Sequence, residues 1–349
     1  MTAWYATPDA RSWTAPAESG PAVAGGARAF HQSLPGYAPT PLVPLPALAA
    51  ELGVGRVLVK DESSRLGLPA FKVLGASWAC HQVLERQPGA TLVTGTDGNH
   101  GRAVARMAAH LGVRAIVFVP AAMLPRTAAL IEAEGAEVLH VDGDYDDAVR
   151  RAAALAAERP GHALVQDTAW PGYEQVPAWI VAGYQTLLEE IDEQLDQAPG
   201  LVVTPVGVGS LAQAVVTHYR RPGRPHPAVL AVEPDTAAGL LASLHAGQPV
   251  AVPTANTVMA GLNCGTVSAA AWPVLHPGCD VAVAVTDQAA LAAEADLGRL
   301  GVSSGPSGAA TLAGARAALT HPERRAALGL GADAVVVLLS TEGSSPGDG

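Results

Sequence analysis

The sequence predicts an α/β protein with mostly parallel sheets that carry helices on both faces. Short β-branched segments alternate along the chain with Ala-rich segments of helical length. Strands that alternate with helices of this length form parallel sheets that helices cover on both sides. With 349 residues, the chain is long enough for two such domains or for one large α/β unit.

The predicted elements follow one another from about residue 29 onward. Residues 1–28 are rich in Ala, Pro, Gly and Ser without periodicity, and we expect a flexible arm there. Strands are predicted at 57–60, 91–94, 115–119, 137–141, 201–205, 229–233, 281–285 and 334–339. Helices are predicted at 72–85, 99–111, 125–134, 145–158, 176–195, 211–219, 288–298 and 308–319. Ligands of such sheets bind beyond the carboxyl ends of the strands, where the motifs described below lie.

Charge and hydropathy exclude several classes of protein. The net charge of -11 argues against a nucleic-acid backbone or an anionic membrane as the main partner. The most apolar run, 201–216, is interrupted by Pro205, Gly207 and Gly209, so it is too short and broken to span a bilayer. The N-terminus lacks the basic start and the continuous apolar stretch of a signal peptide. The composition is that of an ordinary soluble enzyme.

Neither the cysteines nor the acidic residues predict a metal site. Cys80, Cys264 and Cys279 form no C-x-x-C motif, so we expect reduced thiols in the cytoplasm and no metal cluster. A disulfide between Cys264 and Cys279 could form in principle, but small buried side chains are the favoured interpretation. The acidic cluster at 142–147 lacks the Gly and the distal Glu of a calcium loop, which favours a solvated N-cap.

Lysine usage singles out one segment. Among 21 Lys and Arg residues, the lysines are Lys60 and Lys72. Guanidinium stays protonated and is no nucleophile, whereas a desolvated lysine amine can lose its proton and condense with an aldehyde. The segment therefore predicts a Schiff-base lysine. For either lysine taken alone, a buried or paired structural role is the alternative.

A glycine-containing segment at 94–101, Thr-Gly-Thr-Asp-Gly-Asn-His-Gly, follows a strand and begins a helix. Backbone N–H groups at such a helix start bind a carboxylate or a phosphate. Asp97 is unusual in an anion site unless its carboxylate takes part in the chemistry. The alternative is that Asp97 or Asn99 caps the helix.

A second glycine segment, Gly-Val-Gly-Ser-Leu-Ala at 207–212, also lies between a strand and a helix. It matches the G-x-G-x-x-A dinucleotide fingerprint, and Glu233 lies where a ribose-binding acid belongs. The segment could therefore bind NAD or any phosphate held by backbone amides. An NAD-binding dehydrogenase is thus an alternative of another class, although it leaves the lysines and Asp97 unexplained.

Two further segments carry polar groups at predicted strand ends. Asp167 lies in Gln-Asp-Thr-Ala-Trp-Pro-Gly-Tyr at 166–173, between a short strand and a long helix. Carboxylates that share a cleft acquire different pKa values and different proton-transfer roles, although Asp167 could also be a turn or cap residue. Residues 303–309 form another glycine-rich helix start, and Ser-Thr-Glu-Gly at 340–343 ends the last strand. A neutral hydroxyl there can hydrogen-bond an aromatic ring nitrogen without forcing its protonation.

These segments together resemble the fold-type II pyridoxal-phosphate enzymes, and among them the diaminopropionate ammonia-lyases. The resemblance extends over about 30–343 and rests on the segments 31–42, 60–63, 96–102, 166–170, 259–265 and 340–343. Threonine dehydratases share the general plan. Asp97 in the asparagine loop and the 166–170 segment are more particular to the ammonia-lyase branch.

The resemblance implies two three-layer α/β/α domains, a large one from 29–75 and 170–349 and a small one from 76–169. Lys72 would hold the aldehyde of pyridoxal 5'-phosphate, and Asn99 would hydrogen-bond the pyridine hydroxyl. Ser340 would face the ring nitrogen, with Thr341 as its substitute if the register slips by one. The amides that would hold the phosphate are those of Gly207, Val208, Gly209, Ser210 and Leu211.

The implied reaction is β-elimination of ammonia from 2,3-diaminopropionate, which gives pyruvate and ammonia. Members of the branch act on both stereoisomers, which implies Lys72 as base on one face and Asp97 on the other. Asp167 would bind the β-ammonium and protonate or orient it as it leaves. The residues that would bind the substrate are Thr96, Asp97, Gly98, His100 and Asp167. The resemblance also implies a cytoplasmic homodimer.

Two departures from the family pattern keep other substrates open. Gly305 and Pro306 precede Ser307 where relatives often carry an acidic residue, and 265–272 lacks the polar, proline-containing sequence expected of the family. The enzymatic alternative is dehydration or β-replacement on a serine-like, threonine-like or other β-substituted amino acid, which could be biosynthetic. A non-catalytic binding protein that keeps the fold is a third hypothesis.

Overall fold

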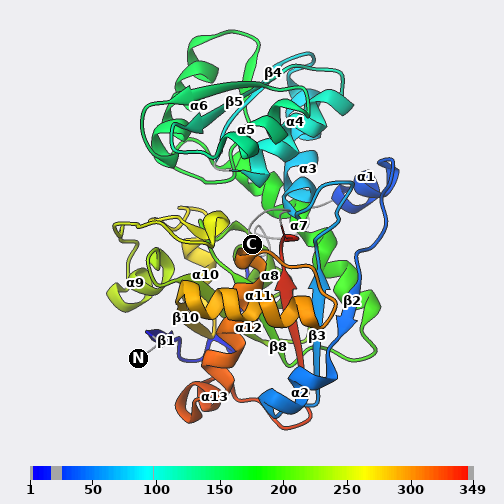
Figure 1. The fold of residues 1–349 in the computed structure, drawn as a ribbon, viewed down its shortest axis with the longest axis vertical. Coiled ribbons are helices and arrows are strands. Elements are labelled where there is room, and N and C mark those ends of the chain that lie inside the picture. Colours follow the sequence, from blue (N-terminus) through cyan, green and yellow to red (C-terminus); the bar gives the residue numbers. More distant parts are fainter. Residues whose placement is uncertain (1–2, 17–25, 97, 345–349) are drawn as a thin grey trace.

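The computed structural model describes residues 3–16, 26–96 and 98–344 and contains two sheets (Figure 1). The strands of the larger sheet are β1 (Trp4–Ala6), β2 (Leu42–Pro44), β3 (Arg56–Asp61), β8 (Leu201–Pro205), β9 (Ala228–Pro234), β10 (Val281–Val285) and β11 (Val335–Ser340). The strands of the smaller sheet are β4 (Thr91–Gly95), β5 (Ala115–Pro120), β6 (Glu137–Val141) and β7 (His162–Leu164). Their orders are β1-β10-β9-β8-β11-β3-β2 and β6-β5-β4-β7.

The strand pairing is parallel in the interior of both sheets. Strands β1 and β2 pair antiparallel with β10 and β3 at the two edges of the larger sheet. The pairs between β10, β9, β8, β11 and β3 are parallel, as are those of the smaller sheet. The prediction of mostly parallel sheets is confirmed.

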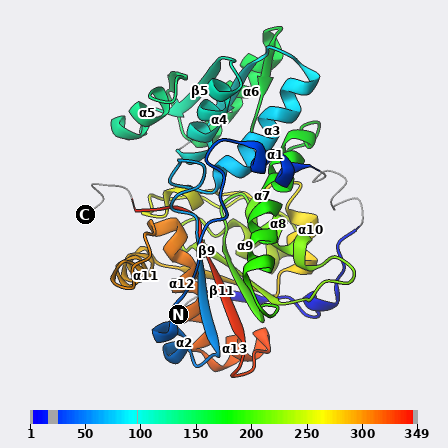
Figure 2. The ribbon, with the colours of Figure 1, turned by 90° about the vertical axis from the view of Figure 1, so that its right-hand side faces the viewer.

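The helices cover the sheets (Figures 1 and 2). They are α1 (Ala27–Ser33), α2 (Pro46–Leu52), α3 (Lys72–Arg86), α4 (Asn99–His110), α5 (Pro125–Glu132), α6 (Tyr145–Glu158), α7 (Gln175–Gln194), α8 (Ser210–Tyr219), α9 (Gly239–Ala246), α10 (Trp272–Gly278), α11 (Asp287–Arg299), α12 (Pro306–Leu319) and α13 (Pro322–Leu328). Among the described residues, no helix combines the length and the apolar character that crossing a membrane requires.

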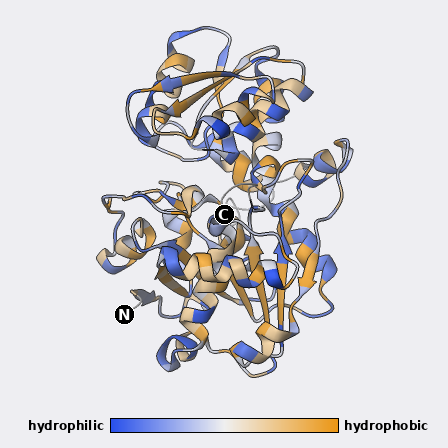
Figure 3. Ribbon diagram, viewed as in Figure 1, coloured by the Kyte–Doolittle hydropathy of each residue, from blue (hydrophilic) through white to orange (hydrophobic). Residues whose placement is uncertain are grey.

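Alternating side chains of the central strands build a core on each face of the larger sheet. In β11, Val337 and Leu339 belong to a cluster that contains residues of α3, α7 and α8. Val336 and Leu338 belong to a second cluster that contains residues of α2 and α12. This alternation follows from the two-residue period of a strand. The strands are accordingly coloured as hydrophobic in Figure 3, and the layers are helix, sheet and helix.

The smaller sheet has the same three layers. Leu92 of β4 packs in the cluster that contains α3 and α4, whereas Val93 packs with Ala148, Ala152 and Leu155 of α6. Helix α6 begins at a capping box, in which Asp144 and the residue three positions later exchange side-chain-to-backbone hydrogen bonds. The prediction of an N-cap in the acidic cluster is therefore confirmed.

Every predicted strand and helix is present, with ends that differ by a few residues. The N-terminal arm requires a correction, because residues that we expected to be flexible are ordered. Strand β1 pairs with the edge strand β10, and Ala10–Ser12 form a 3₁₀-helix. The composition of residues 1–28 does not predict this order, which comes from the hydrogen bonds between β1 and the edge strand β10. Residues 17–25 lie outside the described residues.

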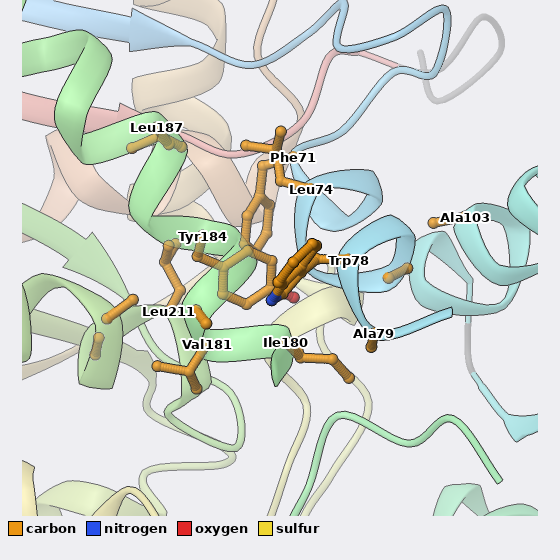
Figure 4. Packing of buried hydrophobic residues seen from close by; sticks show 14 of the residues in the cluster. Phe71, Leu74, Trp78, Ala79, Ala103, Ile180, Val181, Tyr184, Leu187 and Leu211 are labelled. Carbon is orange, nitrogen blue, oxygen red and sulfur yellow. The ribbon is translucent and has the colours of Figure 1, made fainter. Parts of the chain in front are cut away.

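Helices α3 and α7 pack against each other (Figure 4), and a glycine on each helix permits their close approach. A Cβ atom on Gly75 would lie 2.6 Å from Cε1 of Tyr184 and 2.7 Å from Cγ2 of Ile180. A Cβ atom on Gly183 would lie 2.8 Å from the Cα of Gly75. Glycine is therefore required for this close approach. This packing holds Lys72, the first residue of α3, next to the cavity described below.

Lys60 lies in a buried ionic network and not in the cavity. Its Nζ donates to Glu190 Oε2 at 2.8 Å, to Gln194 Oε1 at 2.9 Å and to the carbonyl of Thr40 at 2.9 Å. Arg65 donates to both oxygens of Glu190 at 2.7 Å, and the side chains of Lys60, Arg65 and Glu190 are 0% exposed. The network connects β3, through Lys60, to α7, through Glu190. Lys60 is thus a buried, paired structural lysine, which is the alternative that the sequence left open for either lysine.

Candidate active site

A cavity of about 650 Å³ lies where the loops of the two sheets meet. Its walls come from the start of α3, the β4–α4 and β8–α8 connections, the end of β11 and the start of α12. The sequence-predicted residues that line it are Lys72, Thr96, Gly98, Asn99, His100, Asp167, Gly207, Val208, Gly209, Ser210 and Leu211. Segments far apart in the sequence therefore converge, because all of them follow the carboxyl ends of strands or begin helices beside them.

An ion pair between Lys72 and Asp167 lies in the wall of the cavity. Nζ of Lys72 donates to Oδ2 of Asp167 at 2.5 Å, and the Asp167 side chain is only 5% exposed. Burial alone would raise the pKa of Asp167, but the charge of Lys72, together with His100, outweighs burial and holds this pKa well below its usual range. Asp167 is therefore an ionised carboxylate at neutral pH.

His100 faces the same carboxylate with its Nδ1 nitrogen. Its Nε2 lies 2.9 Å from the carbonyl of Val165, so Nε2 carries the proton and Nδ1 keeps its lone pair. Nδ1 is buried, lies 3.9 Å from Oδ2 of Asp167 and has no hydrogen-bond partner among the described residues. Burial lowers the pKa of His100, which keeps the imidazole neutral. A neutral imidazole placed in this way can accept a proton beside Asp167.

Two polar side chains hold the other oxygen of Asp167. The hydroxyl of Tyr145 lies 3.4 Å from Oδ1, and Nε2 of Gln166 lies 3.3 Å from it. Tyr145 is the first residue of α6 and lines the cavity. Sequence reasoning missed Tyr145, because residues 145–158 carry only the signal of an amphipathic helix.

The start of α4 is capped by Thr96, and not by Asn99. Oγ1 of Thr96 accepts from the amides of Gly98 and Gly101 at 3.0 and 3.1 Å. Asn99 instead directs its side chain to Glu342, with Nδ2 donating to Oε2 at 2.8 Å. Glu342 is a cavity residue that sequence reasoning did not select. Asp97, predicted as a catalytic and substrate-binding residue, lies outside the described residues.

The β8–α8 connection presents a glycine turn at a helix start. Gly209 precedes α8 with a φ of 97°, a conformation that favours glycine. A Cβ atom on Gly207 would lie 3.1 Å from the carbonyl of Gly261. The hydroxyl of Ser210 donates to the carbonyl of Asp167 at 2.7 Å, which joins this turn to the Asp167 segment. Amides at such a helix start form an anion site next to the Lys72 ion pair.

Ser340 is buried at the end of β11, and its place at the ring nitrogen stays a prediction. Its hydroxyl donates to Oγ of Ser304 at 2.8 Å, its side chain is fully buried, and it is not among the described residues that line the cavity. Thr341, the substitute that a register shift of one residue would select, does line the cavity. Successive strand residues face opposite sides, so a shift of one residue exchanges which hydroxyl meets the cavity.

Comparison with known proteins places this cavity in a family. The profile described as pyridoxal-phosphate dependent enzyme matches residues 33–342. This chain belongs to that family. The diaminopropionate ammonia-lyase of Escherichia coli K12 is 38% identical, over 91% of this chain and 88% of the relative. The diaminopropionate ammonia-lyase of Salmonella typhimurium is 36% identical, over 92% of this chain and 89% of the relative.

The solved structures give the same result. The crystal structure of Escherichia coli diaminopropionate ammonia lyase, in complex with an aminoacrylate-PLP azomethine reaction intermediate, matches with a TM-score of 0.89 at 36% identity. The match covers 99% of this chain and 94% of that chain. The prediction of a fold-type II pyridoxal-phosphate enzyme is thereby confirmed.

The residues around the cavity fit pyridoxal 5'-phosphate, the cofactor of this family. The amine of Lys72 and the glycine turn before α8 provide a site for an aldehyde and a site for a phosphate. Two buried polar atoms, Nδ1 of His100 and Oγ of Ser307, have no hydrogen-bond partner among the described residues. Such atoms in a cavity wall are explained when a bound ligand satisfies them.

The NAD alternative does not agree with the family or with Glu233. This residue is buried, and its two oxygens accept from the amides of Leu240 and Leu241 at 2.7 and 2.8 Å. Glu233 therefore caps α9 and is not among the described residues that line the cavity. The fingerprint at 207–212 matched because both cofactors place a phosphate at the start of a helix.

Proposed function

We propose that this chain is a pyridoxal-phosphate-dependent ammonia-lyase that eliminates the β-amino group of 2,3-diaminopropionate and yields pyruvate and ammonia. The observation that carries the proposal is the ionised, buried Asp167 beside Lys72, because it offers a negative charge for a cationic leaving group. The two diaminopropionate ammonia-lyases that cover about nine-tenths of the chain support it.

The residues of the cavity divide between binding the cofactor and acting on the substrate. Lys72 attaches the aldehyde through Nζ, and the amides of 207–211 hold the phosphate. Asn99 donates to the ring hydroxyl, and Ser340 faces the ring nitrogen, with Thr341, which lines the cavity, as its substitute. When bound, pyridoxal phosphate supplies an electron sink that makes the α-proton of an amino acid acidic and allows the β-substituent to leave.

Lys72 and Asp167 share the proton chemistry. Nζ of Lys72 takes the α-proton on one face of the substrate, for which its amine first gives up the proton that it carries in the ion pair with Asp167. The carboxylate of Asp167 is held ionised, so it binds the β-ammonium rather than donating a proton to it. That ammonium already carries the proton with which ammonia leaves. Asp97 is proposed as the base on the opposite face.

The groups around Asp167 keep its carboxylate directed at the leaving group. Tyr145 and Gln166 hold Oδ1 at one end, which leaves Oδ2 for the cation in the cavity. The neutral His100 offers Nδ1 as a hydrogen-bond acceptor for an N–H of the β-ammonium, which keeps its three protons and leaves as ammonia. The start of α4, at Thr96, Gly98 and His100, is proposed to bind the substrate carboxylate through its backbone amides.

The test is keto-acid release from purified protein incubated with D- and L-diaminopropionate, serine and threonine. We expect pyruvate from diaminopropionate at a kcat/KM well above the value for either hydroxy amino acid. Release of keto acid from serine or threonine alone would instead support dehydration. Asp167→Asn separates the two reactions, because a neutral hydroxyl leaving group does not need the carboxylate that a cationic one does.

We further propose that residues 76–169 form the smaller domain, that 29–75 and 170–349 form the larger one, and that the protein is a cytoplasmic homodimer. The strands of the smaller sheet all lie within 91–164. The free, buried thiols of Cys80 and Cys279 agree with a reducing compartment. Two-fold dimers are the commonest soluble oligomers. Sedimentation equilibrium tests the dimer, and a particle of 35.3 kDa would contradict it.

A further inference from the structure

A hydrogen bond between Asn99 and Glu342 connects the two sides of the cavity. Asn99 begins α4, beside the smaller sheet, whereas Glu342 follows β11 of the larger sheet. The Asn99 amide donates to Oε2 of Glu342 at 2.8 Å, and the backbone amide of Ser307 lies 3.3 Å from Oε1. Each oxygen of this carboxylate therefore has a donor from a different wall of the cavity.

The main chain on either side of Glu342 is fixed to the segment that leads into Lys72. The amide of Gly343 donates to the carbonyl of Pro69 at 2.9 Å, and the amide of Phe71 donates to the carbonyl of Thr341 at 3.1 Å. On the other side, the amide of Gly305 donates to the carbonyl of Glu342 at 2.9 Å. The Glu342 side chain therefore extends from an anchored backbone toward Asn99.

This geometry decides which way the Asn99 carboxamide points. The two ends of a carboxamide are similar in size, so hydrogen-bond partners determine its orientation. Burial raises the pKa of Glu342, but both of its oxygens face N–H donors, Asn99 Nδ2 and the amide of Ser307, so each oxygen accepts and the amide nitrogen of Asn99 faces Glu342. The reversed orientation would bring the amide oxygen against the carboxylate. A second N–H of the same nitrogen is then available to the cavity, which Asn99 lines.

We propose that Glu342 is a positioning residue that fixes the Asn99 carboxamide so that its second N–H donates to the ring hydroxyl of pyridoxal phosphate. The inference rests on the role of Asn99 proposed above. It assigns to Glu342 no contact with the substrate and no transfer of a proton. Glu342 acts on the cofactor through Asn99, and its effect disappears when Asn99 is removed.

The test is a double-mutant cycle on the cofactor itself, with Glu342→Ala, Asn99→Ala and the double variant. Binding of pyridoxal phosphate is measured by titration of the apoprotein, and the protonation of the ring hydroxyl by the visible absorption band of the holoprotein. We expect Glu342→Ala to weaken binding about tenfold, the effect of one lost charge-assisted hydrogen bond, and to shift the band toward the near ultraviolet. In the Asn99→Ala background the same substitution should change neither quantity.

Two further variants keep the cycle interpretable. Glu342→Gln preserves the volume of the side chain but places an amide donor against Ser307 or Asn99, so it should shift the band in the same direction by less. It replaces Glu342→Ala if that variant does not fold. Glu323→Ala removes an exposed carboxylate from α13, away from the residues that line the cavity, and should leave band and affinity unchanged.

Additive effects in the cycle would overturn the proposal, because they would show that Glu342 acts on the cofactor independently of Asn99. An unchanged band and affinity in both Glu342 variants would overturn it as well. These outcomes are distinct from a failure of the proposed function. Wild-type protein that shows the normal band but releases no keto acid would contradict the substrate and leave the cycle to decide the role of Glu342.

Discussion

Replacing Glu190 by Gln should destabilise the protein through the buried network of Lys60 and Arg65. The Glu190 carboxylate accepts hydrogen bonds from Lys60 at 2.8 Å and from Arg65 at 2.7 Å, and all three side chains are 0% exposed. Burial alone would raise the pKa of Glu190, but the hydrogen bonds and charges of Arg65 and Lys60 outweigh burial and lower it to about 2. Glu190→Gln keeps the volume and leaves the two cations with one carboxylate, that of Glu62.

The size of the effect follows from the same shift. A pKa lowered from 4.5 to about 2 corresponds to about 3 kcal/mol of folding stability. Removing one partner of a buried ion pair costs about 3–5 kcal/mol, which agrees with that value. We therefore expect the free energy of unfolding at pH 7 to fall by about 3 kcal/mol, with a lower midpoint in urea and an unchanged slope.

The pH dependence gives a second signature. Because folding depresses the pKa of Glu190, its contribution is complete above the unfolded value of 4.5 and is lost as the pH falls toward about 2. The variant should lose less stability than the wild type over that interval. Urea unfolding followed by circular dichroism at several pH values measures both effects.

A neighbouring glutamate provides the control. Glu193 lies on the same helix but is 60% exposed in its pair with Arg28, so Glu193→Gln should change stability by less than about 1 kcal/mol. A Glu190→Gln protein as stable as the Glu193→Gln protein, or one with the pH dependence of the wild type, would refute this reasoning.

Three further predictions concern the cavity and the helix that begins at it. Lys72→Arg keeps a positive charge beside Asp167 but cannot condense with an aldehyde, so borohydride should attach cofactor to the wild-type peptide and not to the variant by mass spectrometry. Asp167→Asn should lower kcat/KM for diaminopropionate about a hundredfold, and an unchanged value would remove Asp167 from leaving-group binding. Gly75→Ala places a methyl group 2.6 Å from Tyr184 and should cost about 1–3 kcal/mol in thermal unfolding. Gly298→Ala in α11 is the control, because a Cβ atom there meets no atom within 4 Å, and it should stabilise the helix by up to about 1 kcal/mol. Equal effects of Gly75→Ala and Gly298→Ala on thermal unfolding would contradict the close approach of α3 and α7.

The fold was largely predictable because its central strands carry local signals. The buried parallel strands are continuous aliphatic runs such as Val-Val-Val-Leu-Leu in β11, which a sequence reveals without knowledge of the neighbouring strands. The three-residue strands β1 and β2 were missed, whereas the short strand before Asp167 is present as β7. Strand β1 exists because Trp4–Ala6 pair with the edge of β10, and a pairing of that kind is a tertiary property that a short segment does not encode.

The site was predictable where a backbone motif carries it and missed where a side chain alone does. The glycine segments and the lysine were found because their composition is unusual. Tyr145 begins an ordinary helix and meets Asp167 only through the packing of α6 on the smaller sheet. Between Ser340 and Thr341 the sequence does not fix which of two adjacent hydroxyls faces the cavity at a strand end. Glu342 was not selected, because the sequence does not show that its side chain lies in the cavity wall.

The most direct test of the central claim is the ratio of ammonia to pyruvate formed from diaminopropionate. Elimination releases the β-amino group, and hydrolysis of the remaining product releases the α-amino group, so both nitrogens leave the substrate. The account predicts two molecules of ammonia for each pyruvate, with coupled assays reading both products in one reaction. Absence of pyruvate from both the D- and the L-isomer would contradict the account, as would a ratio of one, which would mean that one nitrogen was transferred to another molecule and not released as ammonia.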